Sequence, residues 1–168
     1  MIRFKLRQVI NHKNKSLLYL GMTVIFLTMY LLSGAISYKT GIVLPIHPLE
    51  RGIPFLTWSI WIYIVLYPIY IVWSLYSYKD THYMNKTFYC FILLTFISCA
   101  LFILIPVTYP RELFPLPAQS DLSTLLFKQM RAVDKPSNCF PSLHVGLCYL
   151  FSFGFRYENK RNFWIALF

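Results

Sequence analysis

The residues that could do chemistry lie close together in one stretch, Asp134–Gly146, which reads DKPSNCFPSLHVG. Pro136 and Pro141 would stop a helix arriving from the N-terminal side. After Pro141 the chain turns apolar, so Ser142 and His144 are expected at the N-terminus of a buried helix.

A helix N-terminus is a favourable place for an anion, because its first backbone N–H groups point outward and its dipole is positive there. The hydroxyl of Ser142 could add a hydrogen-bond donor. The imidazole of His144 could carry a proton to or from a reacting oxygen. Together these features predict a phosphate site with its own general acid.

The motif Cys139-Phe140-Pro141-Ser142-Leu143-His144 resembles the second signature motif of the type 2 phosphatidic acid phosphatase superfamily. Its Leu143, and the preceding Asn138-Cys139-Phe140, resemble the inositol phosphorylceramide synthase-like branch. The alternative is a proline-rich loop whose His144 only caps a helix.

The resemblance implies a phosphoester reaction that uses neither a metal nor another cofactor. By the family pattern, Ser142 would bind the phosphate and His144 would protonate the leaving oxygen. Arg111, in Tyr-Pro-Arg, is a candidate phosphate-binding arginine of the first motif, although the family's Arg-Pro is Arg-Glu here; the alternative is an anchor at the membrane interface. Asp134 and Lys135 flank the second motif as possible supporting residues, with their roles open.

The nucleophile that this family uses is missing from the 168 residues. A third motif, a histidine followed four residues later by aspartate, would supply it. No histidine follows His144. We therefore expect a chain that is cut short before the third motif and inactive as it stands.

The composition predicts an integral membrane protein, since 57% of the residues are hydrophobic, 19% are aromatic, and the mean hydropathy is +0.53. The net charge of +10 would suggest nucleic acid in a soluble protein, but the basic N-terminal segment leads straight into an apolar run. Nucleic acid is therefore not expected as a partner, whereas membrane lipids and a phosphoester lipid substrate are. The four cysteines have no Cys-x-x-Cys spacing, so no metal site is expected.

The hydrophobic pattern predicts an all-α membrane protein with four complete transmembrane helices and the start of a fifth. Residues 1–16 form a basic cytoplasmic segment, and residues 17–168 form a membrane-embedded domain that is incomplete at its C-terminus. A polar hairpin is expected at 79–87. The predicted apolar runs are 17–37, 55–78 with a kink at Pro68, 88–105, 143–155 and 162–168.

A short amphipathic helix is expected just before the motif. Leu122, Leu125, Leu126, Met130 and Val133 recur at helical spacing, and Asp121 is placed to cap the helix. One interpretation puts this helix in the membrane interface above the site. The other is a loop helix packed on other loops.

Positive charge sets the expected orientation. Alternate connections, at the N-terminus, 79–87 and 156–161, hold ten of the sixteen basic residues in short segments. The N-terminus is therefore expected in the cytoplasm and the Ser142 region on the extracytoplasmic face.

Three functions remain open. The first is a phosphatase or phosphotransferase acting on phospholipid or on isoprenoid or sphingolipid phosphoesters. The second is a non-catalytic membrane remnant or scaffold that binds lipid headgroups. The third, a small transporter, is disfavoured because no charged residue lies inside a predicted span.

Overall fold

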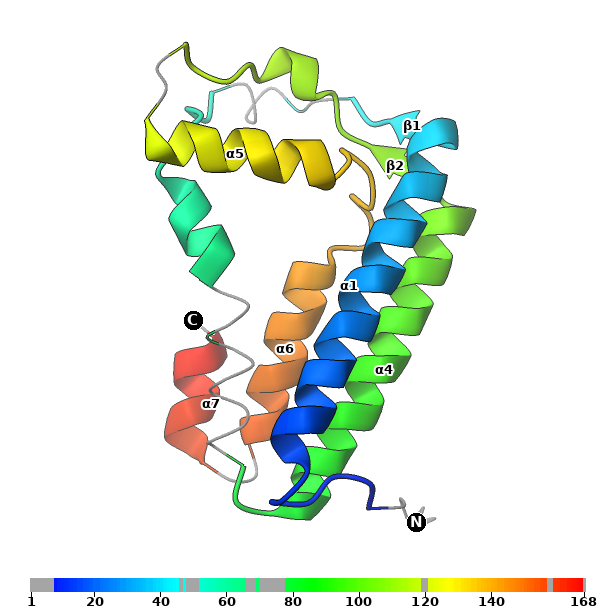
Figure 1. The fold of residues 1–168 in the computed structure, drawn as a ribbon, viewed down its shortest axis with the longest axis vertical. Coiled ribbons are helices and arrows are strands. Elements are labelled where there is room, and N and C mark those ends of the chain that lie inside the picture. The colour runs from blue at the N-terminus through cyan, green and yellow to red at the C-terminus, as the bar shows by residue number, and fades with distance from the viewer. Residues whose placement is uncertain are drawn as a thin grey trace. The chain divides into compact units, whose positions relative to one another are not determined.

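The computed structural model describes residues 8–45, 47, 52–65, 69, 78–118, 121–156 and 159–167. This part of the chain is mainly helical, with one very short pair of strands (Figure 1). The elements in chain order are α1 (Lys15–Thr40), β1 (Ile42–Val43), α4 (Thr81–Leu104), β2 (Val107–Thr108), the 3-10 helix η1 (Arg111–Leu113), α5 (Leu122–Val133), α6 (Leu143–Phe155) and α7 (Lys160–Leu167). Residues 59–65 are helical as well.

Two of the predicted spans are seen as helices of membrane length. α1 has 26 residues and α4 has 24, and both are apolar enough to cross a bilayer. The predicted span 143–155 is α6, an apolar helix of 13 residues. Much of the predicted span 55–78, including Pro68, lies outside the described residues, so four complete spans are not established.

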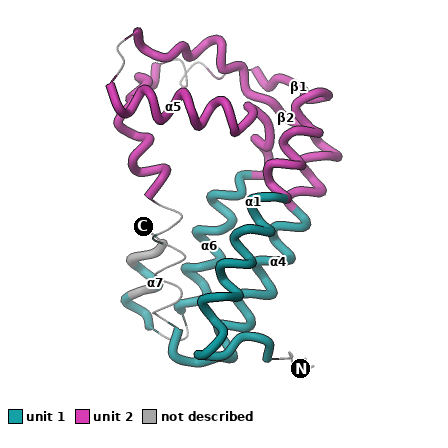
Figure 2. The backbone as a smooth tube through the Cα atoms, in the orientation of Figure 1, with its two compact units in different colours: residues 1–28, 68–97, 142–168 teal, residues 29–67, 98–141 magenta. Residues whose placement is uncertain are grey.

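The chain divides into two compact units (Figure 2). Unit 1 contains residues 1–28, 68–97 and 142–168, and unit 2 contains residues 29–67 and 98–141. The motif is divided as well, since Pro141 ends a segment of unit 2 and Ser142 begins one of unit 1.

Unit 1 is held together by aromatic packing among α1, α4 and α6. Phe91 of α4 lies between Phe26 of α1, at a ring-centroid distance of 5.5 Å, and Phe151 of α6, at 6.3 Å. At the end of α6, Phe155 is fully buried and stacks on Tyr78 at 5.1 Å. These contacts fix α6, which begins with the motif, against α4.

The predicted hairpin at 79–87 is wrong from residue 81 onward, because α4 already begins at Thr81. Asp80 accepts a hydrogen bond from the backbone N–H of His82 (2.8 Å) and so supports the helix start. The buried Asn85 side chain accepts from the N–H groups of Val9 and Ile10, at 2.7 and 2.8 Å. These bonds satisfy Asp80 and Asn85, two of the polar residues that suggested a loop.

In unit 2 a two-residue parallel ladder, absent from the all-α prediction, joins the chain after α1 to the chain after α4. Ile42 pairs with Val107, and Val43 with Thr108. A Cβ on Gly41 would collide with the side chain of Thr108, so this approach requires glycine.

The amphipathic helix is confirmed as α5, and so is its cap. The carboxylate of Asp121 accepts from the backbone N–H of Thr124 at 3.1 Å. The buried Phe127 packs on Phe55 at 5.1 Å. The indole N–H of Trp61 donates to Ser123 Oγ (3.0 Å), so α5 packs on the segment 55–61 within unit 2.

Candidate phosphate site

Ser142 is the N-cap of α6, as the sequence predicted. Its backbone is extended (φ −71°, ψ 106°), and its Oγ accepts from the N–H of Val145 at 3.4 Å. The carbonyl of Ser142 accepts from Gly146 N–H at 3.1 Å, which closes the first turn. As the cap uses Oγ as an acceptor, the hydroxyl hydrogen can be donated to an anion.

Packing holds the first turn of α6 in place. Leu143, Leu147 and Phe151 are buried on one stripe of the helix. A Cβ on Gly146 would lie 3.3 Å from Leu94 Cδ2 of α4, so the two helices approach closely there. Ser142 is exposed and His144 is half-buried, both within unit 1.

The local charge favours an anion. The N-terminus of α6 carries the positive end of the helix dipole. No aspartate or glutamate occurs between residues 135 and 157. Ser142, the first turn of α6 and His144 thus combine donors with a group that can transfer a proton.

Arg111 lies in unit 2, where it contacts the residues that precede the motif. Its Nη1 donates to the carbonyl oxygens of Asp134 (2.6 Å) and Arg131 (3.2 Å). Its Nη2 lies 3.7 Å from Asp134 Oδ2. The guanidinium therefore joins η1 to the end of α5.

Burial and the neighbouring charge of Arg111 have opposite effects on the pKa of Asp134. Burial raises the pKa of the Asp134 carboxyl, and the nearby Arg111 only partly opposes this. Burial, with a smaller effect from Arg111, lowers the pKa of the Arg131 guanidinium. Lys135 is exposed, and its Nζ lies 5.9 Å from the centroid of the Tyr38 ring.

Sequence reasoning missed the residues that fasten the loop before the motif to α1. Asn138 has a left-handed backbone (φ 59°), its Nδ2 donates to the carbonyl of Tyr30 (2.9 Å), and its Oδ1 accepts from Ser37 Oγ (3.1 Å). Ser137 Oγ donates to the carbonyl of Gly34 at 3.0 Å. The small residues Ser33, Gly34 and Ser37 within an apolar span were the available signal.

Backbone bonds hold the same loop along β2. The N–H of Tyr109 donates to the carbonyl of Pro136 (2.9 Å), and the N–H of Cys139 to the carbonyl of Val107 (3.4 Å). Burial raises the pKa of the Cys139 thiol. A raised pKa disfavours the thiolate, so Cys139 is a poor nucleophile at neutral pH.

The structure thus groups the predicted site residues into two sets. Ser142 and His144 share the start of α6 in unit 1, and Arg111 contacts Asp134 in unit 2, with Lys135 next in the chain. Among the described residues, no three His, Cys, Asp or Glu side chains are placed to hold a metal ion.

The family of the chain follows from its match to a known family. A family model described as the PAP2 superfamily matches residues 43–168, a range that includes both sets of site residues. No curated protein and no solved structure matches the chain. The chain belongs to the PAP2 superfamily, the type 2 phosphatidic acid phosphatases.

Proposed function

We propose that this chain carries the phosphate-binding and acid-donating part of a lipid phosphatase or phosphotransferase. The observation that supports this most is the placement of Ser142 and His144 on the first turn of α6, inside the matched region. The substrates proposed are phospholipids or isoprenoid or sphingolipid phosphoesters. The Asn138-Cys139-Phe140 sequence favours the inositol phosphorylceramide synthase-like branch, and with it transfer to an alcohol.

The proposed reaction uses Ser142 and His144 together with a histidine of the family's third motif. The Ser142 hydroxyl and the N-terminus of α6 stabilise the negative oxygens of the phosphoryl group. A histidine of the family's third motif attacks phosphorus, and the bond from phosphorus to the leaving oxygen breaks. His144 donates a proton to that oxygen, so the alcohol leaves neutral. Water or an alcohol then attacks the phosphohistidine, His144 takes the proton of the attacking oxygen, and the bond from phosphorus to the histidine nitrogen breaks.

Arg111 is proposed as a further ligand for phosphate oxygens, supported by Asp134 and Lys135. Its Nη1 is held by two carbonyl groups, whereas its Nη2 lies 3.7 Å from Oδ2 of Asp134. A phosphate oxygen could replace that carboxylate oxygen, since a guanidinium binds both groups through the same fork of donors.

We propose that the N-terminus is cytoplasmic and that Ser142 faces the opposite side of the membrane. Within unit 1, contacts of Asn85 with the N-terminal segment and of Tyr78 with Phe155 bring the start of α4 and the end of α6 together. Ser142 lies at the other end of α6. Basic residues flank the start of α4 and the end of α6 along the chain, or belong to the N-terminal segment: Lys13, Lys15, Lys79, Lys86, Arg156, Lys160 and Arg161. This separation supports the orientation.

The test uses a form of the protein that also carries the third motif. His144→Ala should lower turnover of an alkyl phosphate lipid by roughly 10²–10⁴, which is the usual contribution of a positioned acid. The loss should be much smaller for an aryl phosphate, whose leaving group needs no proton. An equal loss for both substrates would make His144 a structural residue and would contradict the proposal.

A second candidate is a protein that binds lipid headgroups without turnover. It is favoured by the structural use of Arg111 Nη1, which donates to the carbonyl oxygens of Asp134 and Arg131. For the 168-residue polypeptide alone we propose this outcome, because binding without a nucleophile does not open the covalent route.

A further inference from the structure

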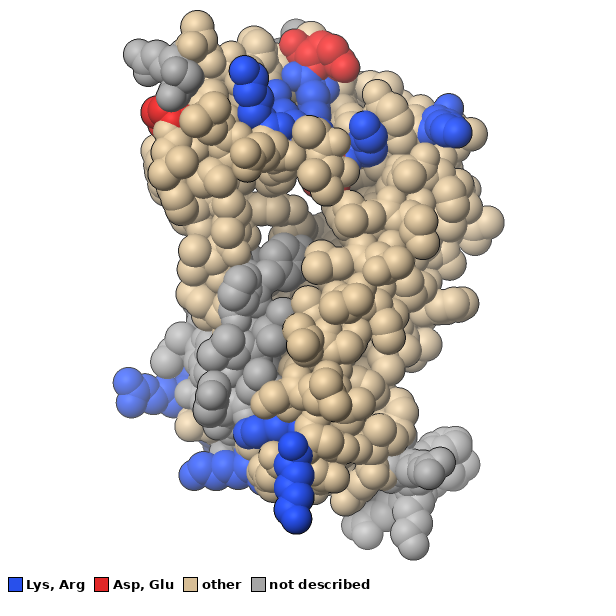
Figure 3. Space-filling view, in the orientation of Figure 1, with Lys and Arg blue, Asp and Glu red and all other residues tan. Residues whose placement is uncertain are grey.

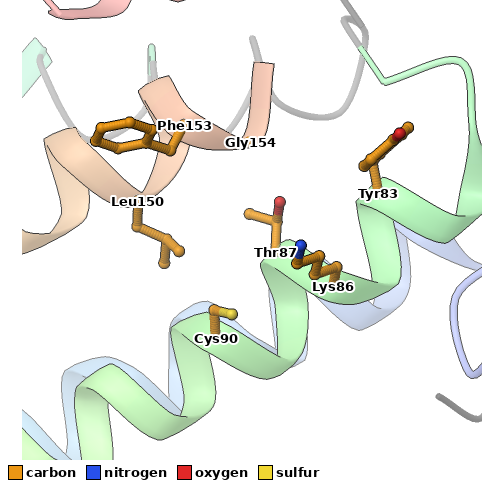
Figure 4. A pocket seen from close by; sticks show the side chains of 7 residues that line it. All are labelled: Tyr83, Lys86, Thr87, Cys90, Leu150, Phe153 and Gly154. Carbon is orange, nitrogen blue, oxygen red and sulfur yellow. The ribbon is translucent and has the colours of Figure 1, made fainter. Parts of the chain in front are cut away.

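A pocket of about 230 Å³ opens in unit 1, at the other end of α6 from Ser142 (Figure 4). Its two walls are formed by one face of each of two helices. One face comes from α4 and the other from α6: Tyr83, Lys86, Thr87 and Cys90, and Leu150, Phe153 and Gly154. From Ser142 to Gly154 the helix rises by about 18 Å, so this pocket is distinct from the candidate phosphate site.

Beneath the pocket, α4 and α6 are in close contact. Thr87 is buried, and its Oγ1 lies 2.8 Å from the hydroxyl of Tyr78. A Cβ on Gly154 would fall on that Tyr78 hydroxyl and 2.8 Å from Thr87 Oγ1. The glycine therefore lets α6 approach α4 beneath the pocket.

The two ends of the pocket differ in chemistry. Lys86 and Tyr83 belong to the first two turns of α4 and form the polar end of the pocket. Cys90, Leu150 and Phe153 are apolar or weakly polar and continue the pocket along the helices. Tyr83 and Cys90 are separated by about 10 Å along α4, enough for a polar head followed by part of a hydrocarbon chain.

The charge around the pocket favours an anionic ligand. Lysine and arginine side chains gather at this end of unit 1, the lower end in Figure 3. Asp80 is the one acidic residue that the structure describes in this unit. Basic residues at a membrane surface attract anionic lipids, and a lysine near a helix end can extend its ammonium to the headgroup level.

We propose that this pocket binds one anionic phospholipid, with the phosphate at Lys86 and an acyl chain along Cys90, Leu150 and Phe153. The bound lipid contacts both α4 and α6 and so stabilises unit 1. This goes beyond the proposed reaction, because the lipid is held at the opposite end of α6 and is not a substrate.

The test measures lipid binding to the purified full chain in a zwitterionic detergent by native mass spectrometry. Phosphatidylglycerol should bind about fivefold more tightly than phosphatidylcholine, the preference expected from one interfacial lysine. Lys86→Gln should remove this preference. Cys90→Phe, which fills the pocket, should weaken binding of both lipids. The matched control is Lys13→Gln, which removes an exposed charge at the same end but does not line the pocket.

Equal effects of Lys13→Gln and Lys86→Gln would mean diffuse surface attraction and would overturn the proposal. So would equal binding of the two lipids by the unaltered chain, or displacement of phosphatidylglycerol by millimolar inorganic phosphate. The preference for phosphatidylglycerol should persist in a His144→Ala background, and Lys86→Gln should still remove it there. A loss there would assign the bound lipid to the candidate phosphate site, so failure of this inference is distinct from failure of the proposed function.

Discussion

The contact of Asn138 with α1 makes a quantitative prediction about the loop before the motif. Asn138→Ala removes the bonds to the Tyr30 carbonyl and to Ser37 Oγ. Each bond is worth about 1 kcal/mol. Alanine must also adopt the left-handed backbone of residue 138 (φ 59°), which costs about 1 kcal/mol more. The total loss of unfolding free energy should be about 3 kcal/mol.

Asn138→Gly separates the two contributions. Glycine loses the same side-chain bonds but takes a positive φ freely, so the loss should be about 2 kcal/mol. The matched control is Gln129→Ala, at an exposed position of α5, which should change stability by less than about 0.5 kcal/mol.

The assay is thermal unfolding of the full chain in detergent, followed by tryptophan fluorescence. At about 2–4 °C per kcal/mol for a chain of this size, Asn138→Ala should lower Tm by roughly 6–12 °C and Asn138→Gly by roughly 4–8 °C. Equal stability of the two variants would refute the predicted cost of the left-handed backbone for alanine. If both variants were as stable as the control, the predicted contribution of the Asn138 hydrogen bonds would be refuted.

Three further predictions test other parts of the structure. In a cysteine-free background, a membrane-impermeant thiol reagent should label Ala118→Cys but not His12→Cys; the reverse pattern would refute the orientation. Gly154→Ala should destabilise the protein by about 1–3 kcal/mol, because its Cβ meets Tyr78 and Thr87, whereas Gly21→Ala, whose Cβ meets nothing within 4 Å, should be neutral or stabilising. The raised pKa of Asp134 means that the folded state holds its proton more tightly than the unfolded state. The stability of the unaltered chain relative to Asp134→Asn should therefore fall as pH rises from the ordinary Asp value towards the raised value, and a rise would contradict that assignment.

Local signals in the sequence predicted the elements nearest the motif. Asp121 before a periodic apolar stripe predicted α5 and its cap, and Pro141-Ser142 before an apolar run predicted the start of α6. Both depend on backbone groups within a few residues of the predicting side chain. Such signals can be read without knowledge of the tertiary fold.

The errors and omissions involve partners that are distant in sequence. The start of α4 was missed because Asn85 finds its hydrogen-bond partners at Val9 and Ile10. The hydrogen bonds of Asn138 with Tyr30 and Ser37 join residues more than a hundred positions apart. The β1–β2 ladder likewise rests on a long-range pairing of two-residue segments, too short to give a periodic pattern.

The central proposal is that Ser142 and His144 supply the phosphate-binding and acid groups of a phosphoryl-transfer site, whose attacking histidine belongs to the family's third motif. The most direct measurement is phosphate release from lysophosphatidic acid, phosphatidic acid and an aryl phosphate by the purified 168-residue polypeptide, beside a form that carries the third motif. We expect release only by the longer form, and its loss in Ser142→Ala and His144→Ala. Turnover by the 168-residue polypeptide that disappears in either variant would contradict the account, because another group would then be attacking phosphorus.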